Sequence, residues 1–401
     1  MTYNVEKIRA DFPSLESGIA YFDGPGGSQT PLVVGEAISK ALTSPLSNRG
    51  VTTLSEQSAN EIVLEYRSAV ADLVGADAGG VVYGRSWTQL VYDFSRTLAK
   101  SWGPGDEIVV TNLDHDSNVR PWIQAAESRG ATVKWAKFDL ETGELPVEAV
   151  ARQLTSKTKF VSVTGASNVL GTKPDLAGIS REVHKAGALF AVDGVHLTPH
   201  AVIDVKAIGA DFFGFSSYKM LGPHCGAMIA DPALLESLKN DKLLPSTMDV
   251  PERFEFGTLP YEIMAGATAA INYTASLDRD AQGSRREKII TSMNSLDKYE
   301  HELFSYLESE ISKVPGLKSF GKSADRTPTI FFQIAGKVSA DIYKALATSK
   351  INAPASNFYA LECSRALGLG DLGAVRAGLA PYSTREDVDR LATALKEIAL
   401  S

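Results

Sequence analysis

The feature that most constrains the fold is a regular alternation of short apolar runs and helix-like segments between about residues 80 and 230. The helix-like segments are SWTQLVYDFSRTLAKSW, RPWIQAAESRG and LAGISREVHKAG. The apolar runs are GGVVYG, DEIVVTN, ATVKWAKF, TKFVSVTG, GALFAVDG, DFFGFS and CGAMIA. Strands rich in Val and Phe that alternate with helices are typical of parallel βαβ units with helices on both faces. The sequence therefore predicts an α/β fold with a mostly parallel sheet.

The pattern changes after about residue 275. A long amphipathic pattern over 284–314 predicts a helix, and TIFFQI and AVRAGLAPY predict two strands. Ser383 with Glu386 three residues later predicts a capping box at the start of the last helix. A chain of 401 residues can bury more than one core. We expect a large domain over 20–275, and a small α+β domain built from 1–19 and 276–401.

Composition narrows the class of protein. The net charge of -8 argues against nucleic acid or an anionic membrane as a partner. No apolar run reaches the ~18 residues of a membrane span, and the first residues lack an apolar signal core. Two cysteines form no disulfide framework, and the absence of CxxC and HExxH argues against a structural zinc site or a zinc protease. We expect a cytoplasmic protein.

Polar side chains follow the predicted strands, and parallel sheets carry functional groups at these ends. Each alone means little, because most Ser and Thr residues at a helix start are ordinary caps and most loop histidines lie at the surface. The segments are Arg85–Thr88, Asp114–Asn118, Ala166–Asn168, Asp193–His196 and Ser216–Lys219.

Together these residues supply what pyridoxal 5′-phosphate (PLP) requires. PLP needs a lysine for a Schiff base, a carboxylate at its pyridine nitrogen, phosphate donors, a donor at its phenolic oxygen and a group stacked on its ring. In that order the candidates are Lys219, Asp193, Thr88 with Ser216, Asn168 with His196, and His115.

Motifs along nearly the whole chain give the same indication. They are YFDGPGGSQTP, GRSWTQ, DHDSNVRPW, ASNVLGT, DGVHLTPH, DFFGFSSYKMLGP, RFEFGTLP and VRAGLAPYSTREDVDRL. In order and spacing they resemble the class V aminotransferase superfamily, in particular its cysteine desulfurase-like branch. The resemblance implies the PLP-dependent transferase fold of type I, which is aspartate aminotransferase-like, and a PLP-dependent enzyme acting on a small amino acid.

The resemblance also implies residue roles. Lys219, Asp193 and His115 would be catalytic: the Schiff-base lysine, the pyridinium partner and the histidine stacked on the ring. Arg376 would bind the substrate carboxylate, for which its guanidinium fork is suited. Thr258 would reach the phosphate in a partner subunit, which implies a homodimer. Further cofactor contacts would come from Trp87, Thr88, Asn168, His196, Ser216 and Tyr218, and Asn168 would also contact the substrate.

The chain departs from the desulfurase pattern at several positions. His196 stands where the family usually has glutamine, Tyr218 where it has histidine, and Asp116 where it has a second histidine. The catalytic cysteine of the family falls on or near Phe358, and the nearest thiol is Cys363. We expect Cys363 to be a buried, non-catalytic residue near the start of a helix, and Cys225 to be structural.

Three functions remain open on this basis. The first is cysteine desulfurase-like carbon–sulfur lyase chemistry without a conventional catalytic cysteine. The second is transamination or epimerisation on the same scaffold, since fold alone does not select a reaction. The third is a non-catalytic binding module, although GPGGS lacks the GxGxxG spacing of a dinucleotide site.

Overall fold

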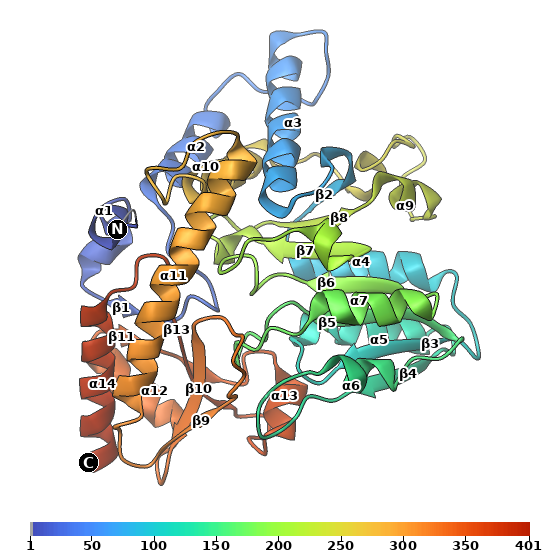
Figure 1. Ribbon diagram of the computed structural model, residues 1–401. Helices are drawn as coiled ribbons and strands as arrows, with labels where there is room; N and C mark the ends of the chain where they lie inside the picture. Colours follow the sequence, from blue (N-terminus) through green and yellow to red (C-terminus); the bar gives the residue numbers. More distant parts are fainter. Residues whose placement is uncertain (1–2) are drawn as a thin grey trace.

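The computed structural model describes residues 3–401 and is built around a seven-stranded sheet with helices on both faces (Figure 1). The strand order is β2-β8-β7-β6-β5-β3-β4. The strands are β2 (Val81–Gly84), β3 (Glu107–Thr111), β4 (Thr132–Ala136), β5 (Thr158–Thr164), β6 (Leu189–Asp193), β7 (Phe212–Ser216) and β8 (Gly226–Ala230). Each lies within one of the seven apolar runs, so these predicted strands are confirmed.

Neighbouring strands from β4 to β7 run parallel, whereas β8 is antiparallel to both β7 and β2. The segment between β7 and β8 contains only a 3₁₀ turn, Ser217–Lys219, and no crossover helix. A parallel connection needs a crossover of a dozen or more residues, so this short link reverses the chain direction. The sheet is therefore mostly parallel, as predicted, with an antiparallel edge.

Alternating side chains divide between two cores. On β3, Ile108 and Val110 join the core under α4 and α5, while Val109 joins the opposite core. This period of two is expected for a strand buried on both faces. The helices of this region are α2 (Leu32–Leu42), α3 (Leu54–Val74), α4 (Trp87–Ala99), α5 (Arg120–Glu127), α6 (Val147–Ala151), α7 (Leu176–Lys185), α8 (Val205–Ile208), α9 (Pro232–Ser237) and α10 (Tyr261–Thr274).

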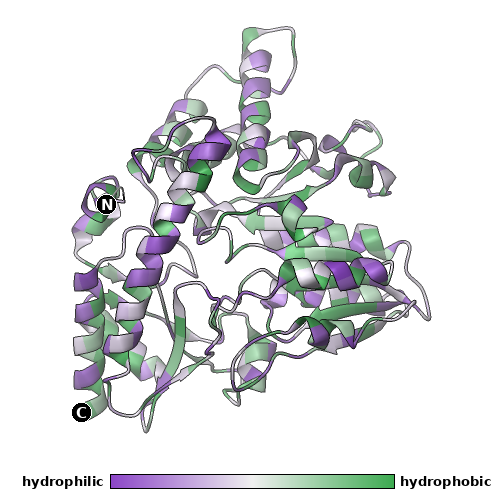
Figure 2. Ribbon diagram, viewed as in Figure 1, coloured by the Kyte–Doolittle hydropathy of each residue, from purple (hydrophilic) through white to green (hydrophobic). Residues whose placement is uncertain are grey.

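The rest of the chain packs beside this sheet around a core of its own. A four-stranded antiparallel sheet of order β12-β13-β10-β9 packs with three helices, and the short strands β1 and β11 pair in parallel. The elements are α1 (Val5–Arg9), β1 (Ala20–Tyr21), α11 (Arg285–Ile311), β9 (Leu317–Phe320), β10 (Thr329–Ile334), α12 (Ser339–Thr348), β11 (Ile351–Asn352), β12 (Ala355–Ser356), α13 (Leu361–Ala366), β13 (Ala374–Gly378) and α14 (Arg385–Leu400). The predicted long helix over 284–314 is confirmed as α11, and Figure 2 shows polar and apolar residues alternating along it and along α14.

The predicted capping box of the last helix is wrong by one residue. Thr384 is the N-cap of α14, and it exchanges hydrogen bonds with Asp387 rather than Glu386. The hydroxyl of Ser383 instead accepts a hydrogen bond from the Ala380 amide in the preceding turn.

Residues 3–401 contain neither a membrane-spanning helix nor a cluster of metal-ligating side chains. No helix in this range is long and apolar enough to cross a membrane. The same residues contain no group of three or more His, Cys, Asp or Glu side chains placed to hold a metal ion.

Candidate active site

The carboxyl ends of neighbouring strands bring the predicted site residues together. Asp193 is the last residue of β6, and Lys219 follows β7 in the 3₁₀ turn. Because β6 and β7 are paired in parallel, both side chains lie at the same edge of the sheet. Both are buried, with 4% and 8% of their surface exposed.

Two adjoining cavities share this edge. The inner one is small, about 40 Å³, and the outer one is about 600 Å³. Both are lined by Thr88, His115, Ser117, Asn168, Tyr218 and Lys219. The inner cavity adds Trp87, Asp193, His196 and Ser216, and the outer one adds Arg376. Every predicted cofactor or substrate residue except Thr258 therefore lines this pair of cavities.

Burial shifts the two charged groups at the base of the site toward their neutral forms. The pKa of Lys219 falls to about 8, because burial disfavours the ammonium and the positive charge of Arg376 adds to the effect, while Asp193 opposes it. The pKa of Asp193 rises to about 6 through burial, against a hydrogen bond from the Val195 amide and the charge of Lys219. A lysine with such a pKa is available as a neutral amine close to neutral pH.

His115 is held in one orientation beside the cavity. Its Nδ1 accepts a hydrogen bond from the Ser117 amide at 3.1 Å, so in the neutral ring Nε2 carries the proton. Burial, with the charges of Lys219 and Arg376, lowers the pKa of His115 to about 3. The ring of Tyr359 stacks on the imidazole, with centroids 5.4 Å apart.

His196 and Asn168 each present an unused polar atom. Nε2 of His196 lies 3.0 Å from the Thr327 hydroxyl and 3.1 Å from the Thr329 hydroxyl, while its buried Nδ1 has no partner. Nδ2 of Asn168 donates to the Phe358 carbonyl at 2.9 Å, and its buried Oδ1 has no partner. Burial lowers the pKa of His196 well below its usual value, so the ring is neutral.

The amino end of α4 also borders the two cavities. Ser86 caps the helix by accepting from the Gln89 amide at 3.2 Å, and the Trp87 amide donates to the Ser216 hydroxyl at 3.0 Å. The Thr88 side chain is exposed to the cavity. The Trp87 indole packs against Gly214, where a Cβ would lie 1.9 Å from the ring. A helix start with nearby hydroxyls is a suitable cradle for a phosphate.

Arg376, on β13, extends from the second sheet into the outer cavity and is 2% exposed. Its Nη1 donates to the Asn168 carbonyl at 3.0 Å, and the guanidinium lies 3.7 Å from the centroid of the Phe358 ring. Its Nε is buried without a partner. Burial lowers the pKa of Arg376 to about 9, against the negative charge of Asp23.

The residues that line the two cavities are suited to bind PLP. Buried polar groups are normally hydrogen-bonded, so unpartnered atoms that gather at one cavity indicate a missing ligand. His196 and Asn168, which carry two such atoms, line the cavity that Lys219 and Asp193 also line. The amino end of α4 lies at the same cavity and suits the phosphate.

The remaining predicted residues lie elsewhere. Thr258 is exposed and lines neither cavity of its own subunit. Cys363 is fully buried in α13, and Cys225 is buried directly before β8, as predicted for both. Burial raises the pKa of both thiols, that of Cys225 to about 12.

Sequence reasoning missed several residues that line the outer cavity. Tyr92 lies one helical turn after Thr88 on α4, a spacing that could have indicated it. Pro25 and Gly26 belong to the YFDGPGGSQTP motif, but no residue role had been drawn from it. Arg120 lies in the DHDSNVRPW motif, four residues after its partner Asp116, a spacing that could have indicated it. Tyr359 had no comparable signal, because its partner His115 is distant along the chain.

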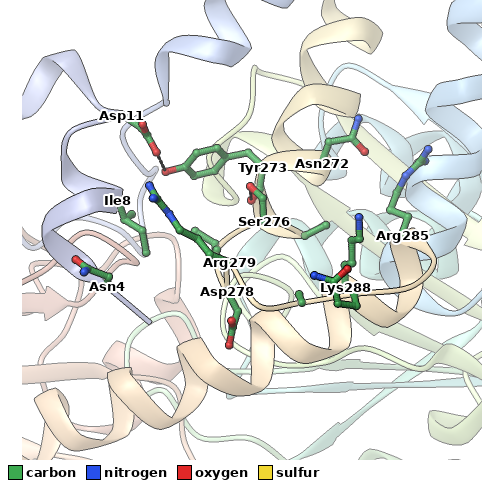
Figure 3. Close-up of a pocket in the computed structure, with 14 residues that line it drawn as sticks. Asn4, Ile8, Asp11, Asn272, Tyr273, Ser276, Asp278, Arg279, Arg285 and Lys288 are labelled. Carbon is green, nitrogen blue, oxygen red and sulfur yellow. Dashed lines mark hydrogen bonds between the residues drawn. The ribbon is translucent and has the colours of Figure 1, made fainter. Parts of the chain in front are cut away.

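A separate cavity of about 710 Å³ lies between α1, the end of α10 and the start of α11 (Figure 3). Its side chains include Asp11, which accepts a hydrogen bond from the Tyr273 hydroxyl at 2.9 Å, and Arg279. None of the predicted site residues lines it.

Comparison with known proteins gives consistent matches. The family model "Aminotransferase class-V" matches residues 20–391. The chain is 36% identical to the uncharacterized protein MT3887 of Mycobacterium tuberculosis, over 99% of this chain and 100% of that protein. The cysteine desulfurase CsdA of Escherichia coli has a similar structure, with a TM-score of 0.87, 27% identity and coverage of 99% and 98%. A C-DES variant with glycine covalently linked to its PLP cofactor shares the fold, with a TM-score of 0.81, 18% identity and coverage of 97% and 99%.

Proposed function

We propose, since the chain belongs to the class-V aminotransferase family and is a PLP-dependent enzyme, that it cleaves the carbon–sulfur bond of a cysteine-type amino acid without a catalytic cysteine of its own. Bound PLP supplies an electron sink for the substrate α-carbon. Proton transfer, substrate binding and cofactor binding are assigned to residues of the protein.

Lys219 is proposed as the covalent anchor of the cofactor and as the base that moves the α-proton. Its lowered pKa keeps a substantial neutral fraction near pH 8. Asp193 is proposed to hold the proton on the pyridine nitrogen. The opposite charge of that ring nitrogen would favour the carboxylate form, against the effect of burial.

Arg376 is proposed to bind the substrate carboxylate. Its guanidinium is held in place by the Asn168 carbonyl and the Phe358 ring, and its Nε is free to donate. His115, neutral and fixed by Ser117, is proposed to stack on the cofactor ring. Thr88, Ser216 and the start of α4 would bind the phosphate, and His196 and Asn168 would contact the phenolic oxygen.

The observation that carries the proposal is the lack of a thiol at the site. Among the described residues that line the two cavities there is no cysteine, and an aromatic residue, Phe358, stands in the loop expected to carry it. Cys363 is fully buried, and its thiol pKa is raised by burial and by the charge of Asp114. A persulfide mechanism needs an exposed thiolate, so direct elimination of sulfur is favoured.

The test is product analysis with the holoenzyme. With L-cysteine or a cysteine thioether, direct elimination yields sulfide or a thiol together with pyruvate and ammonia. Sulfide with alanine would instead identify a desulfurase. Exchange of the α-proton or formation of the matching keto acid, without sulfur release, would identify an epimerase or an aminotransferase and overturn the proposal.

We also propose a homodimer in which Thr258 completes the partner's phosphate site. The support is a set of exposed apolar side chains: Val51, Leu54, Leu244 and Phe256 are 79%, 81%, 99% and 53% exposed. The ion pair between Arg49 and Glu252, at 3.2 Å, joins the segment that carries Val51 and Leu54 to the segment that carries Phe256. Large apolar side chains that are exposed in one subunit are candidates for burial against a second copy.

A further inference from the structure

The outer cavity is large compared with the amino acid that the proposed function requires. The cofactor is expected to take the part next to Asp193 and Lys219, and the carboxylate of the substrate the part next to Arg376. The cavity of about 600 Å³ continues past these groups to Tyr359, which is 72% exposed. Free cysteine would leave this outer part unfilled.

The outer cavity has an apolar wall beside its polar and charged groups. The rings of Tyr92, Phe358 and Tyr359 line it, together with Pro25 and Pro121. The face of Phe358 is engaged by the Arg376 guanidinium, and Tyr359 stacks on His115. These contacts fix two rings at the side of the cavity, and burying apolar groups against such rings is favourable.

At the mouth of the outer cavity, no cationic side chain among residues 3–401 is free to pair with an acidic side chain of a substrate. Arg120 Nη2 lies 2.9 Å from Asp116 and 3.1 Å from Glu362, so two carboxylates already surround this guanidinium. Glu362 also lies 3.5 Å from Arg365, which pairs with Asp371. Among the described residues that line the outer cavity, the other cations are Lys219 and Arg376, which already have proposed roles.

We propose that this outer part is a side-chain subsite for an uncharged apolar group. Given the proposed lyase function, on which this identification rests, the substrate is then a cysteine thioether whose sulfur carries an apolar substituent. Neither free cysteine nor a dicarboxylic amino acid fits the subsite as well. The buried position of Cys363 agrees with this, because a thioether needs no sulfur acceptor.

The reaction balances without a further reagent except water. The α-proton passes to the Lys219 amine, the Cα–H electron pair becomes the second bond between Cα and Cβ, and the Cβ–S bond breaks. The thiolate leaves with the electrons of that bond and takes up a proton. Water hydrolyses the released 2-aminoacrylate to pyruvate and ammonia, and no atom is oxidised by an external acceptor.

The first experiment compares matched substrates with the wild-type holoenzyme. S-butyl-L-cysteine, S-carboxymethyl-L-cysteine, S-(2-aminoethyl)-L-cysteine and L-cysteine are assayed for pyruvate. We expect kcat/KM for the butyl compound to exceed the other three by at least about tenfold, which is the effect of about 1.4 kcal/mol. Equal or better turnover of cysteine, or of either charged analogue, would overturn the subsite.

A binding experiment separates the subsite from the lyase function. L-norleucine and L-glutamate contain no sulfur, and their binding is followed by the change in the cofactor spectrum. Tighter binding of norleucine without cleavage of any thioether would support the apolar subsite and overturn the lyase function. Cleavage of thioethers with no preference among side chains would support the lyase function and overturn the subsite.

Variants test the walls individually. Tyr359→Ala should lower the butyl-to-cysteine ratio of kcat/KM roughly five- to tenfold, and Tyr359→Phe should restore it. Asp116→Asn removes one of the two carboxylates at Arg120, and should raise kcat/KM for the carboxymethyl compound relative to the butyl compound. Leu372→Ala, at a position 86% exposed that does not line the cavity, is the control and should change neither ratio. Unchanged ratios in both wall variants would refute the assignment.

Discussion

Replacing Cys363 with serine separates direct elimination from a persulfide mechanism. The thiol is fully buried in the first turn of α13, and burial raises its pKa well above the usual range. A thiolate is therefore very sparsely populated near neutral pH, and the side chain lines neither cavity. We expect Cys363→Ser to keep kcat/KM within about threefold, under 1 kcal/mol of transition-state stabilisation. Stability should fall by about 1–3 kcal/mol, because a hydroxyl is buried in place of a thiol.

The assay follows pyruvate and sulfide or thiol release, with urea unfolding of the same samples. Cys225→Ser is the matched control, since Cys225 is equally buried, and its thiol pKa is raised to about 12. Mass spectrometry of wild type during turnover reports any extra sulfur. A loss of more than about a hundredfold in Cys363→Ser alone, about 2.7 kcal/mol, with extra sulfur on Cys363, would refute direct elimination.

The other predictions concern the cofactor, the dimer and pH. Lys219→Ala should lose the visible band of the lysine–PLP Schiff base, and retention of that band would contradict the anchor. Asp193→Ala should still bind PLP by absorbance yet lose at least about a hundredfold in kcat, and near-normal turnover would exclude its pairing with the pyridine nitrogen. Thr258→Ala should weaken PLP binding in a species that light scattering shows to be a dimer; a monomer active at high dilution would rule out shared sites. Burial raises the pKa of Asp114 from 3.8 to about 7, so this group binds more protons in the folded state, and its own contribution to stability should fall as pH rises from about 4 to 7, by up to about 4 kcal/mol. Asp114→Asn should remove that part of the fall, as measured by urea unfolding, and an unchanged pH profile would contradict it.

The sheet and the inner site could be predicted because the signals are local. Each strand lies within a mostly apolar run, and the polar residue at its carboxyl end, as Asp193 in β6, is placed by the strand end alone. Lys219 follows from the same rule, since it lies three residues beyond β7. The antiparallel direction of β8 also follows from the sequence, because the link from β7 is too short for a parallel crossover.

The outer cavity could not be predicted, because its contacts join residues that are distant in the sequence. Arg120 meets Glu362 across 242 positions of sequence, and Arg376 meets Asn168 across 208. Such pairs form only when the second sheet packs beside the first. The start of α14 illustrates the same limit on a small scale. Ser383 and Thr384 are each followed by an acidic residue three positions later, and only the tertiary fold decides which one caps the helix.

The conformation of the loop that carries Phe358 and Tyr359 indicates whether this segment is fixed or mobile. Both residues have positive φ, 52° and 58°, a conformation that costs non-glycine residues about 1–3 kcal/mol each and is found mainly at functional sites. The compensating contacts come from the site itself, because the Asn168 side chain donates to the Phe358 carbonyl and the Asp116 amide to the Tyr359 carbonyl at 2.6 Å. A loop that delivers a cysteine to substrate must move freely, whereas movement here would break the hydrogen bond of Asn168 and uncover Arg376. The strain and its compensation therefore favour a fixed wall at this position, which is what a side-chain subsite requires and a mobile sulfur carrier does not.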